Sequence, residues 1–372
     1  MHYLAVVSSH TATSLGHSSE SSSIENQLIA ANPITESLGN AHTSRNHNSS
    51  RFGKFINLHY CVDGVIISAS LRTYLLETVR VVSQSKGERN FHVFYEMLAG
   101  MPEEDLLRIG LLRAPAQHSG DNACVSECES ECGSGVGSDA SVEVDFRYMP
   151  PTTFDDSESK LKQHELDADN FSLFHEALHA LHFSEEDQRS LLDIVAAVLH
   201  LGNISFVESD VAGEESALFS SESLNIHVPF VCSALCISEE ALLVAVARRG
   251  FTVNGVTTTK TLNVRAAAQT TDTFARNLYA HLFSLVLTSI NQRLAMTMTD
   301  VDAWNRPDVA STISLLDIFG FEFFETNSFE QLCINYANEK LQDHFNDSVF
   351  RMEQELYAVE GLEWTPIDYP DN

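Results

Sequence analysis

The sequence has few basic residues for its acid content. It carries 22 Lys and Arg against 52 Asp and Glu in 372 residues, a formal net charge of −30. Nucleic acid and anionic membranes are themselves negative, so this charge excludes both as favoured partners. No apolar run reaches the ~18 residues of a membrane helix, which predicts no transmembrane segment. The first seven residues also lack the basic leader of a signal peptide.

Cysteine is sparse and odd in number. The seven cysteines are widely and irregularly spaced, which is typical of reduced thiols in the cytoplasm rather than of a disulfide framework. Cys124, Cys128 and Cys132 lie in a Ser-, Gly- and acid-rich insert, 115–145, at a spacing that leaves either a metal site or free thiols open. Zinc motifs favour tighter pairs and a fourth ligand. We therefore predict that residues 118–142 are irregular, exposed and metal-free.

The rest of the chain is patterned as helices and short strands, without a repeat of 20–50 residues. Residues 55–60 and 65–67 predict two strands joined by a turn at Asp63-Gly64. Residues 71–82 have helical spacing. Residues 312–319 are almost continuously apolar and predict a strand buried on both faces, as in a parallel sheet. The predicted fold class is α/β.

Other segments predict helices, flexible loops and one unusually long helix. The remaining predicted helices are 91–98, a helix capped by Ser184, 238–249 and an amphipathic helix through 274–294, with a Thr-rich loop or hairpin at 251–263. Residues 8–25 are Ser-rich and predict a flexible loop. Ser328 and Gln331 form a capping box that opens a helix through 356, packed by Phe329, Tyr336 and Phe345. At about 1.5 Å per residue its far end would lie tens of ångströms from Asp317.

Two polar segments lie next to predicted strand ends. Residues 46–54 (Asn-His-Asn-Ser-Ser-Arg-Phe-Gly-Lys) offer amides, hydroxyls and an arginine that suit phosphate oxygens and Mg²⁺. Residues 317–322 (Asp-Ile-Phe-Gly-Phe-Glu) place an acid where α/β nucleotide enzymes hold Mg²⁺, and a glycine that lets a backbone N–H approach a phosphate. Taken alone, the first segment is more typical of an ordinary turn, and the second is equally compatible with a strand followed by a loop.

Together the two segments resemble switch I (N-x-N-S-S-R-F-G-K) and switch II (D-I-x-G-F-E) of the myosin motor domain. Residues 31–34, 39–41, 89–95 and 196–204 also resemble stretches of that family. Residues 327–336 (Asn-Ser-Phe-Glu-Gln-Leu-Cys-Ile-Asn-Tyr) resemble the start of its relay helix. The resemblance runs in order from about residue 1 to 364, interrupted by the acidic insert. It implies a fragment of a P-loop NTPase motor domain, with a few central-sheet strands and a large, mainly helical upper subdomain.

The resemblance implies ATP and Mg²⁺ as cofactors and assigns residues to them. Asn46 and Ser49 would face the nucleotide phosphates. Ser50 would bind Mg²⁺, and Asp317 would hold the ion through water. The backbone N–H of Gly320 would contact the γ-phosphate.

The resemblance also assigns catalytic roles. Arg51 and Glu322 would form an ion pair that closes the site and positions the attacking water, together with Ser49 and Gly320. These are the tasks of phosphoryl transfer. We expect the two charged side chains to approach to about 2.7–2.9 Å, as a bidentate fork.

The sequence departs from the family pattern in two respects. It contains no G-x-x-x-x-G-K-[ST] phosphate loop, because Gly53-Lys54 is followed by Phe55. We therefore expect this chain by itself to be a truncated, inactive piece or a short isoform.

The family's actin-facing loop often has an acid, Ser or Thr sixteen residues before the Asp of its D-A-L-A-K run. Counting back from Asp272 gives Val256, one residue before Thr257, which leaves phosphorylation there open.

The sequence leads to one functional hypothesis and one rival. The hypothesis is the central part of an actin-based, Mg-ATP-dependent motor in the cytoplasm and on the cytoskeleton, with light chains or calmodulin as further partners of the whole protein. The rival is a non-catalytic motor remnant that acts as an interaction module. An upstream phosphate loop encoded in frame would distinguish them.

The predicted segments are 1–30 (helix end and Ser-rich loop), 31–54 (lead-in and switch I), 55–310 (upper subdomain), 311–322 (strand and switch II) and 323–372 (relay helix and start of the lower subdomain).

Overall fold

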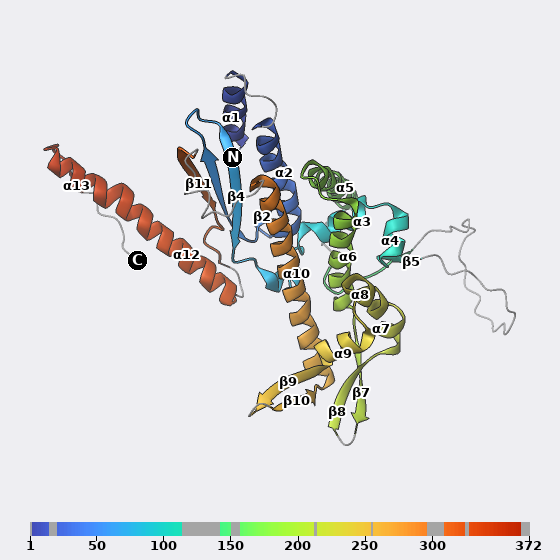
Figure 1. Cartoon of the computed structure of the whole chain (residues 1–372). Helices are drawn as coiled ribbons and strands as arrows, with labels where there is room; N and C mark the ends of the chain where they lie inside the picture. The colour runs from blue at the N-terminus through green and yellow to red at the C-terminus, as the bar shows by residue number, and fades with distance from the viewer. Residues whose placement is uncertain are drawn as a thin grey trace. The chain divides into compact units, whose positions relative to one another are not determined.

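The computed structural model describes residues 2–14, 21–113, 142–149, 157–211, 214–253, 256–295, 309–323 and 327–365. The chain forms two compact units, each built from separate stretches of sequence (Figure 1). Unit 1 comprises Met1–Ile29, Asn48–Glu77 and Leu287–Asn372. Unit 2 comprises Ala30–His47 and Thr78–Val286. The predicted α/β class is confirmed.

Helices and short strands are interspersed along the whole chain. The first half contains α1 (His2–Ser14), α2 (Ser21–Gly39), β1 (Asn40–Ala41), β2 (Ser49–Ser50), β3 (Gly53–Tyr60), β4 (Ile66–Tyr74), η1 (Thr78–Val81), α3 (His92–Gly100), α4 (Glu103–Arg108), β5 (Leu112–Arg113), β6 (Val142–Glu143) and α5 (Ser157–Ala180). The second half contains α6 (Glu185–Gly202), β7 (Phe206–Val211), β8 (Glu214–Phe219), α7 (Ser221–Asn225), α8 (His227–Leu235), α9 (Glu239–Ala247), β9 (Arg248–Val253), β10 (Val256–Thr261), α10 (Val264–Ala295), β11 (Ser311–Asp317), α12 (Phe329–Asn346), η2 (Asp347–Arg351) and α13 (Met352–Val359).

Unit 1 is organised around an antiparallel sheet with the order β11-β3-β4. The hairpin predicted from the Asp63-Gly64 turn is confirmed. Gly64 has a φ of +79°, which favours glycine, and its N–H donates to Cys61 O at 3.0 Å. Leu58 and Ala69 stand opposite each other in the ladder and are both buried.

The helix predicted over 71–82 is wrong. Leu71 is the partner of Ile56 in the β3–β4 ladder, and the ladder continues to the pair Gly53–Tyr74. A short 3₁₀ turn, η1, is the only helical part of that stretch. The apolar spacing of these residues fits a helix face, but pairing with β3 satisfies the backbone of the same residues along a strand, so tertiary context overrides the local pattern.

The strand predicted at 312–319 exists as β11, but its predicted environment is wrong. β11 pairs antiparallel with β3, and most of its residues are exposed. Within the described residues no strand pairs with its other edge. The apolar run therefore predicted the strand correctly, whereas burial depends on neighbours that the described part of the chain does not supply.

The Ser-rich loop predicted at 8–25 is largely helical where it is described. α1 continues to Ser14 and α2 begins at Ser21, while 15–20 lie outside the described residues. Buried Ser8 explains part of this order, because its hydroxyl donates to Glu25 Oε1 at 2.6 Å and accepts from the Ile66 N–H at 2.8 Å. Polar composition alone does not reveal such a long-range anchor.

Unit 2 is mainly helical and confirms the helices predicted there, except that Arg248 and Arg249, at the end of the helix predicted over 238–249, belong to β9. Ser184 caps α6, accepting from the Asp187 N–H at 3.1 Å. The core includes Phe91, whose ring stacks on that of Tyr279 with ring centres 4.9 Å apart. The Thr-rich segment at 251–263 forms the β9–β10 hairpin.

Most of the predicted insert, 115–145, with its three cysteines, lies outside the described residues. Its end is more ordered than predicted, because β6 pairs with β5 and Val144 is buried. In the described part of the chain, no group of three or more His, Cys, Asp or Glu side chains is arranged to hold a metal ion. Among the described residues, no single helix is long and apolar enough to span a membrane. Only α8 and α9 taken together have the length and composition of a membrane span, and they are bent by 101° at the break between them.

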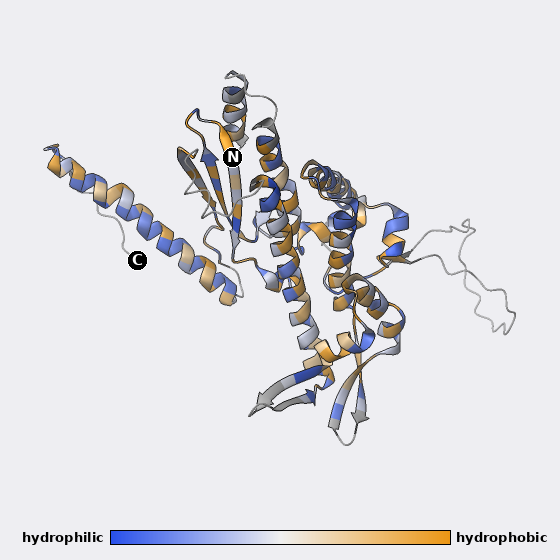
Figure 2. Cartoon of the chain, viewed as in Figure 1, coloured by the Kyte–Doolittle hydropathy of each residue, from blue (hydrophilic) through white to orange (hydrophobic). Residues whose placement is uncertain are grey.

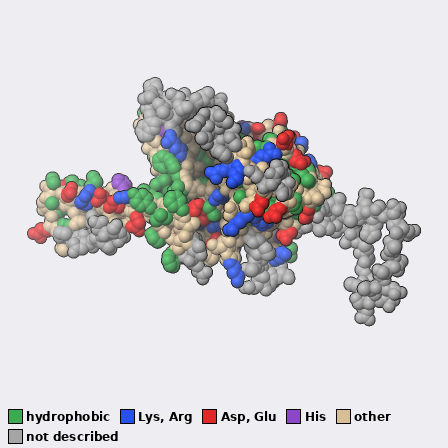
Figure 3. Space-filling view, turned by 90° about the horizontal axis from the view of Figure 1, so that it is seen from below, with side chains coloured by type: hydrophobic (Ala, Val, Ile, Leu, Met, Phe, Trp, Pro, Cys, Tyr) green, Lys and Arg blue, Asp and Glu red, His purple; other side chains and the backbone are tan. Residues whose placement is uncertain are grey.

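The long helix predicted from residue 328 is confirmed as a continuous run of α12, the π-helical turn η2 and α13. Its packing is not as predicted, because Phe329 is 75% exposed, Tyr336 is 64% exposed and Phe345 is also exposed. Hydrophobic positions recur along this helix among hydrophilic ones (Figure 2), and hydrophobic side chains lie open on the molecular surface (Figure 3). Within the described residues of unit 1, no other helix or strand buries these three rings.

Candidate functional site

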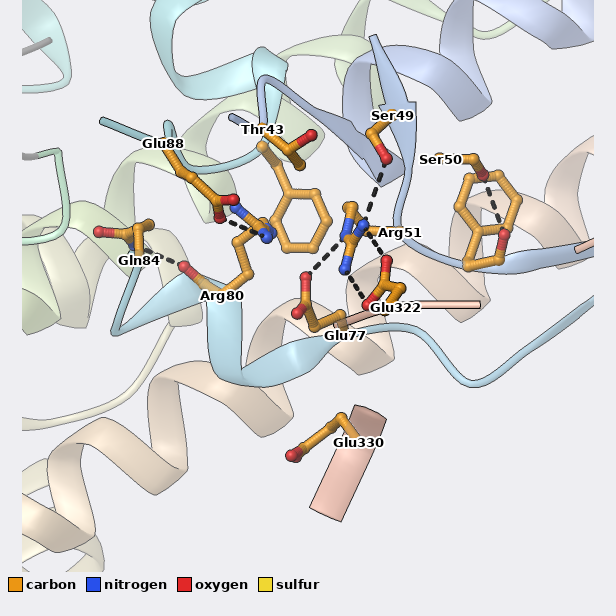
Figure 4. Close-up of polar contacts among 12 residues, drawn as sticks. Thr43, Ser49, Ser50, Arg51, Glu77, Arg80, Gln84, Glu88, Glu322 and Glu330 are labelled. Carbon is orange, nitrogen blue, oxygen red and sulfur yellow. Dashed lines mark hydrogen bonds and ion pairs between the residues drawn. The ribbon is translucent and has the colours of Figure 1, made fainter. Parts of the chain in front are cut away.

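Arg51 is the centre of a buried polar cluster in unit 1. It follows β2, and its side chain is 1% exposed. Its Nη1 donates to Glu322 Oε1 at 2.6 Å and its Nη2 to Glu322 Oε2 at 3.0 Å. The predicted bidentate contact, between residues 271 positions apart, is therefore confirmed (Figure 4).

A second carboxylate completes the cluster. Arg51 Nε donates to Glu77 Oε2 at 2.8 Å, and the Glu77 N–H donates to Arg51 O at 2.9 Å. Burial by itself lowers the pKa of Arg51, but hydrogen bonds and charge from Glu77 and Glu322 outweigh burial and raise it. The cluster of one guanidinium and two carboxylates carries a formal charge of −1. The two carboxylates hold the arginine firmly in its charged form.

Glu322 is held through its backbone as well as its side chain. Its N–H donates to Asn335 Oδ1 at 2.8 Å, and its carbonyl accepts from Asn335 Nδ2 at 2.8 Å. Asn335 lies on α12, so the loop that carries Glu322 is joined to that helix by a matched pair of hydrogen bonds. A displacement of either element therefore pulls on the other.

Gln331 connects the start of α12 to the two carboxylates. Its Oε1 accepts from the Ser328 N–H at 2.9 Å, as the predicted capping box requires. Its Nε2 lies 3.3 Å from Glu77 Oε1 and 3.4 Å from Glu322 Oε2. The first turn of the helix and the charge cluster thus share one amide.

The two predicted switch I hydroxyls have different partners. Ser49 Oγ accepts from Arg51 Nη1 at 3.2 Å, which joins it to the cluster. Ser50 Oγ donates to Phe52 O at 2.9 Å, so its lone pairs can still accept a ligand (Figure 4). The structure therefore brings Ser49, Arg51 and Glu322 together and leaves Ser50 turned toward its own backbone.

The segment from β11 to Glu322 carries the other predicted residues of switch II. Asp317 is exposed at the end of β11 and stands opposite Lys54 in the ladder. Gly320 is exposed, and a Cβ added there would meet no atom within 4 Å. An oxygen donor and an accessible backbone amide on one short loop suit a metal ion and an anionic ligand.

Asn46 belongs to unit 2, where it forms a turn with Thr43. The Thr43 N–H donates to Asn46 O at 2.9 Å, and the Asn46 N–H donates to Thr43 Oγ1 at 3.2 Å. Sequence reasoning missed Glu77, Gln331 and Asn335 as members of the site. Only the family resemblance of residues 327–336 pointed near the last two, and no local pattern marked Glu77.

Comparison of the sequence with known proteins assigns the chain to a family. The sequence matches the family of the myosin head (motor domain) over residues 1–372, and the chain belongs to that family. It is 35% identical over 353 residues to Unconventional myosin-Ic-A of Xenopus laevis, covering 94% of this chain and 30% of the relative. It is 36% identical to Myosin-1 of Arabidopsis thaliana, covering 94% of this chain and 26% of the relative. The chain thus spans less than a third of the length of these curated relatives.

Proposed function

We propose that this chain is the central part of an actin-based motor that couples Mg-ATP hydrolysis to movement along actin. The observation that carries the proposal is the buried fork between Arg51 and Glu322, at 2.6 and 3.0 Å. Two side chains so far apart in sequence meet where switch I and switch II of the myosin family would meet. A pair of unrelated surface loops would leave both charges in solvent.

The residues around the fork fit Mg²⁺ and a nucleotide phosphate. Ser50 and Asp317 would hold the ion with oxygen atoms, which is the ligand type that Mg²⁺ prefers. When bound, Mg²⁺ would neutralise phosphate charge. Ser49 would face the phosphates, and the exposed Gly320 would direct its N–H toward them. The family resemblance assigns Asn46 to the phosphates as well.

The chain's own residues would contribute to hydrolysis by positioning the attacking water and by excluding solvent. Arg51 and Glu322 close the two segments on each other, and a water placed against the Glu322 carboxylate would be oriented by it. Asn335 holds the Glu322 backbone at 2.8 Å on both its amide and its carbonyl. Closure of the site would therefore reach α12 directly, which is a route from chemistry to movement.

One surface feature supports actin as the partner. The β9–β10 hairpin lies where the family has its actin-facing loop, and its base exposes Arg248, Arg249 and Lys260. Arg249 and Lys260 are directly paired, an arrangement that costs stability in isolation and suits an acidic partner. This local basic cluster opposes the repulsion that a chain at −30 would feel from acidic actin. Cytoskeletal localisation, and light chains or calmodulin as partners of the whole protein, belong to the same proposal.

A chimera tests the proposal. This chain would replace the matching segment of Unconventional myosin-Ic-A of Xenopus laevis, with the unaltered relative as the control. We expect actin-activated Mg-ATP hydrolysis, abolished by Arg51→Glu or Glu322→Arg. The double exchange should recover only part of the activity, because Glu77 would then face the new Glu at 51. A folded chimera without hydrolysis would refute the motor proposal.

We also propose that this chain by itself does not turn over ATP. Its sequence contains no G-x-x-x-x-G-K-[ST], and that loop supplies backbone amides and a lysine for the phosphates. Calorimetric titration with Mg-ATP should show no binding tighter than about millimolar, since the remaining switch contacts are few. Micromolar affinity would contradict this expectation and indicate a substitute phosphate site.

The exposed side of α12 and α13 favours a second candidate function, a non-catalytic interaction module. Tyr336, Met352 and Leu356 are all exposed on this helix, and apolar side chains recurring on one helix are a common protein-binding feature. The chimera distinguishes the two functions. Hydrolysis that depends on Arg51 supports the motor, whereas a folded chimera without hydrolysis leaves the interaction module.

A further inference from the structure

Two imidazoles meet in the stretch of unit 2 that leads into switch I. The Nδ1 atoms of His42 and His47 are 3.3 Å apart. Their ring centres are 4.6 Å apart, and the ring planes are inclined by 65°. His47 is exposed and His42 is half-buried, so solvent reaches the pair. Neither residue has a role in the site described above.

The backbone around the pair is fixed by hydrogen bonds that do not involve the rings. Thr43 and Asn46 close the turn between the two histidines with N–H contacts of 2.9 and 3.2 Å. The His42 carbonyl accepts from the Arg89 N–H at 3.0 Å, and the Ser44 N–H lies 3.4 Å from Glu88 Oε1. The turn therefore presents the rings to each other, and a ligand would not have to order them.

The separation of the two nitrogens is compatible with two interpretations. A hydrogen bond from an N–H usually measures about 2.7–3.2 Å, so 3.3 Å is long for one. Two nitrogens that each lie ~2.0–2.1 Å from one tetrahedral zinc ion are separated by about 3.3 Å. The observed spacing therefore fits two ligands on one ion as well as it fits a long hydrogen bond.

Charge around the pair is compatible with a cation. Burial, followed by the charges of His47 and Arg89, lowers the pKa of His42, which keeps this ring neutral near pH 7 and able to bind a metal. The carboxylates of Glu88 and Asp167 act in the opposite direction and favour positive charge at His42. A dication at the pair would be attracted by both carboxylates and repelled by Arg89, and it would not compete with a proton on His42.

We propose that His42 and His47 form a two-histidine site for a borderline divalent transition-metal ion such as Zn²⁺. Both ligands are Nδ1 atoms, and water fills the other positions, since no third His, Cys, Asp or Glu ligand joins them among the described residues. Imidazole suits zinc and copper, whereas Mg²⁺ prefers oxygen. The site is therefore distinct in chemistry from the Mg²⁺ site proposed at switch I, and its ion would stiffen the turn two residues before Ser49.

The experiment removes competing donors first. The reference protein would be the whole chain with Cys124, Cys128 and Cys132 changed to Ser, and with the exposed histidine pair of α5, His175 and His179, changed to Gln. Calorimetric titration with Zn²⁺ at pH 7.5 should show one ion per chain. Loss of either ligand, by His42→Gln or His47→Gln, should weaken binding by about tenfold or more.

Two further measurements make the result specific. The change His281→Gln, at an exposed histidine on α10, should leave zinc binding unchanged. Zn²⁺ should slow hydrogen exchange at the Thr43 and Asn46 amides in the reference protein but not in the His47→Gln variant. Because His47 is exposed, this variant should fold even if His42→Gln does not.

Several outcomes would overturn the proposal. They are equal zinc affinity in the His47→Gln variant and the reference, no zinc binding at all, or the same response to Mg²⁺. Any of these would leave the contact as a long hydrogen bond between two imidazoles.

Discussion

Removing the cation from the buried cluster should destabilise unit 1 far more than removing one anion. In Arg51→Met, Glu77 and Glu322 lose their shared partner and face each other in a buried site. Breaking a buried ion pair in this way costs about 3–5 kcal/mol. In Glu322→Gln, Arg51 keeps Glu77 at 2.8 Å, so the expected cost is about 1.5–3 kcal/mol, that of a hydrogen bond to a charged group. The order of the two variants follows from the presence of Glu77.

Urea unfolding at pH 7 measures both costs. Trp364 lies in the described part of unit 1, where its ring contacts Tyr357, so its fluorescence reports on that unit. The control is Arg351→Met, which removes an ion pair whose side chains are 59% and 41% exposed and should cost less than about 1 kcal/mol. A smaller loss for Arg51→Met than for Glu322→Gln would refute the reasoning, because it would show that the two carboxylates do not depend on the arginine.

Three further predictions concern other parts of the structure. Burial raises the pKa of Glu96 to about 7 from 4.5, so the folded state binds this proton more tightly than the unfolded state. The free energy of unfolding should therefore fall by a few kcal/mol between pH 4.5 and 7, on the order of 1.4 kcal/mol per pKa unit. Glu96→Gln should flatten this pH profile in urea titrations at several pH values. Gly100→Ala would place a Cβ about 2.5 Å from the Phe171 side chain and should cost roughly 1–3 kcal/mol by thermal melting, whereas Gly250→Ala, with no atom within 4 Å, should not. Asn335→Ala should speed hydrogen exchange at the Glu322 amide by about tenfold or more, the equivalent of a net hydrogen bond of ~1.4 kcal/mol. An unchanged rate would show that Asn335 does not hold the loop of Glu322.

Local chemistry determined several features that the sequence alone could predict. Asp63-Gly64 supplies the positive φ of the β3–β4 turn, and Ser184 supplies a hydroxyl for the N-terminus of α6. These features depend on residues within a few positions of one another, so a short stretch of sequence contains all the atoms involved. The contact between Arg51 and Glu322 was also predicted, but only because their segments resemble the two switches of a known family.

Tertiary structure decided what no short stretch contains. Leu71 has helical spacing with its neighbours, yet it forms a strand because Ile56 stands opposite it. β11 is apolar, yet most of its residues are exposed, because burial depends on what covers a strand and not on its composition. Glu77 joins the site only because the hairpin β3–β4 returns the chain to Arg51, and Asn335 joins because α12 begins beside the loop of Glu322. Charge, caps and turns are local properties of this sequence, whereas partners across the fold are created by folding itself.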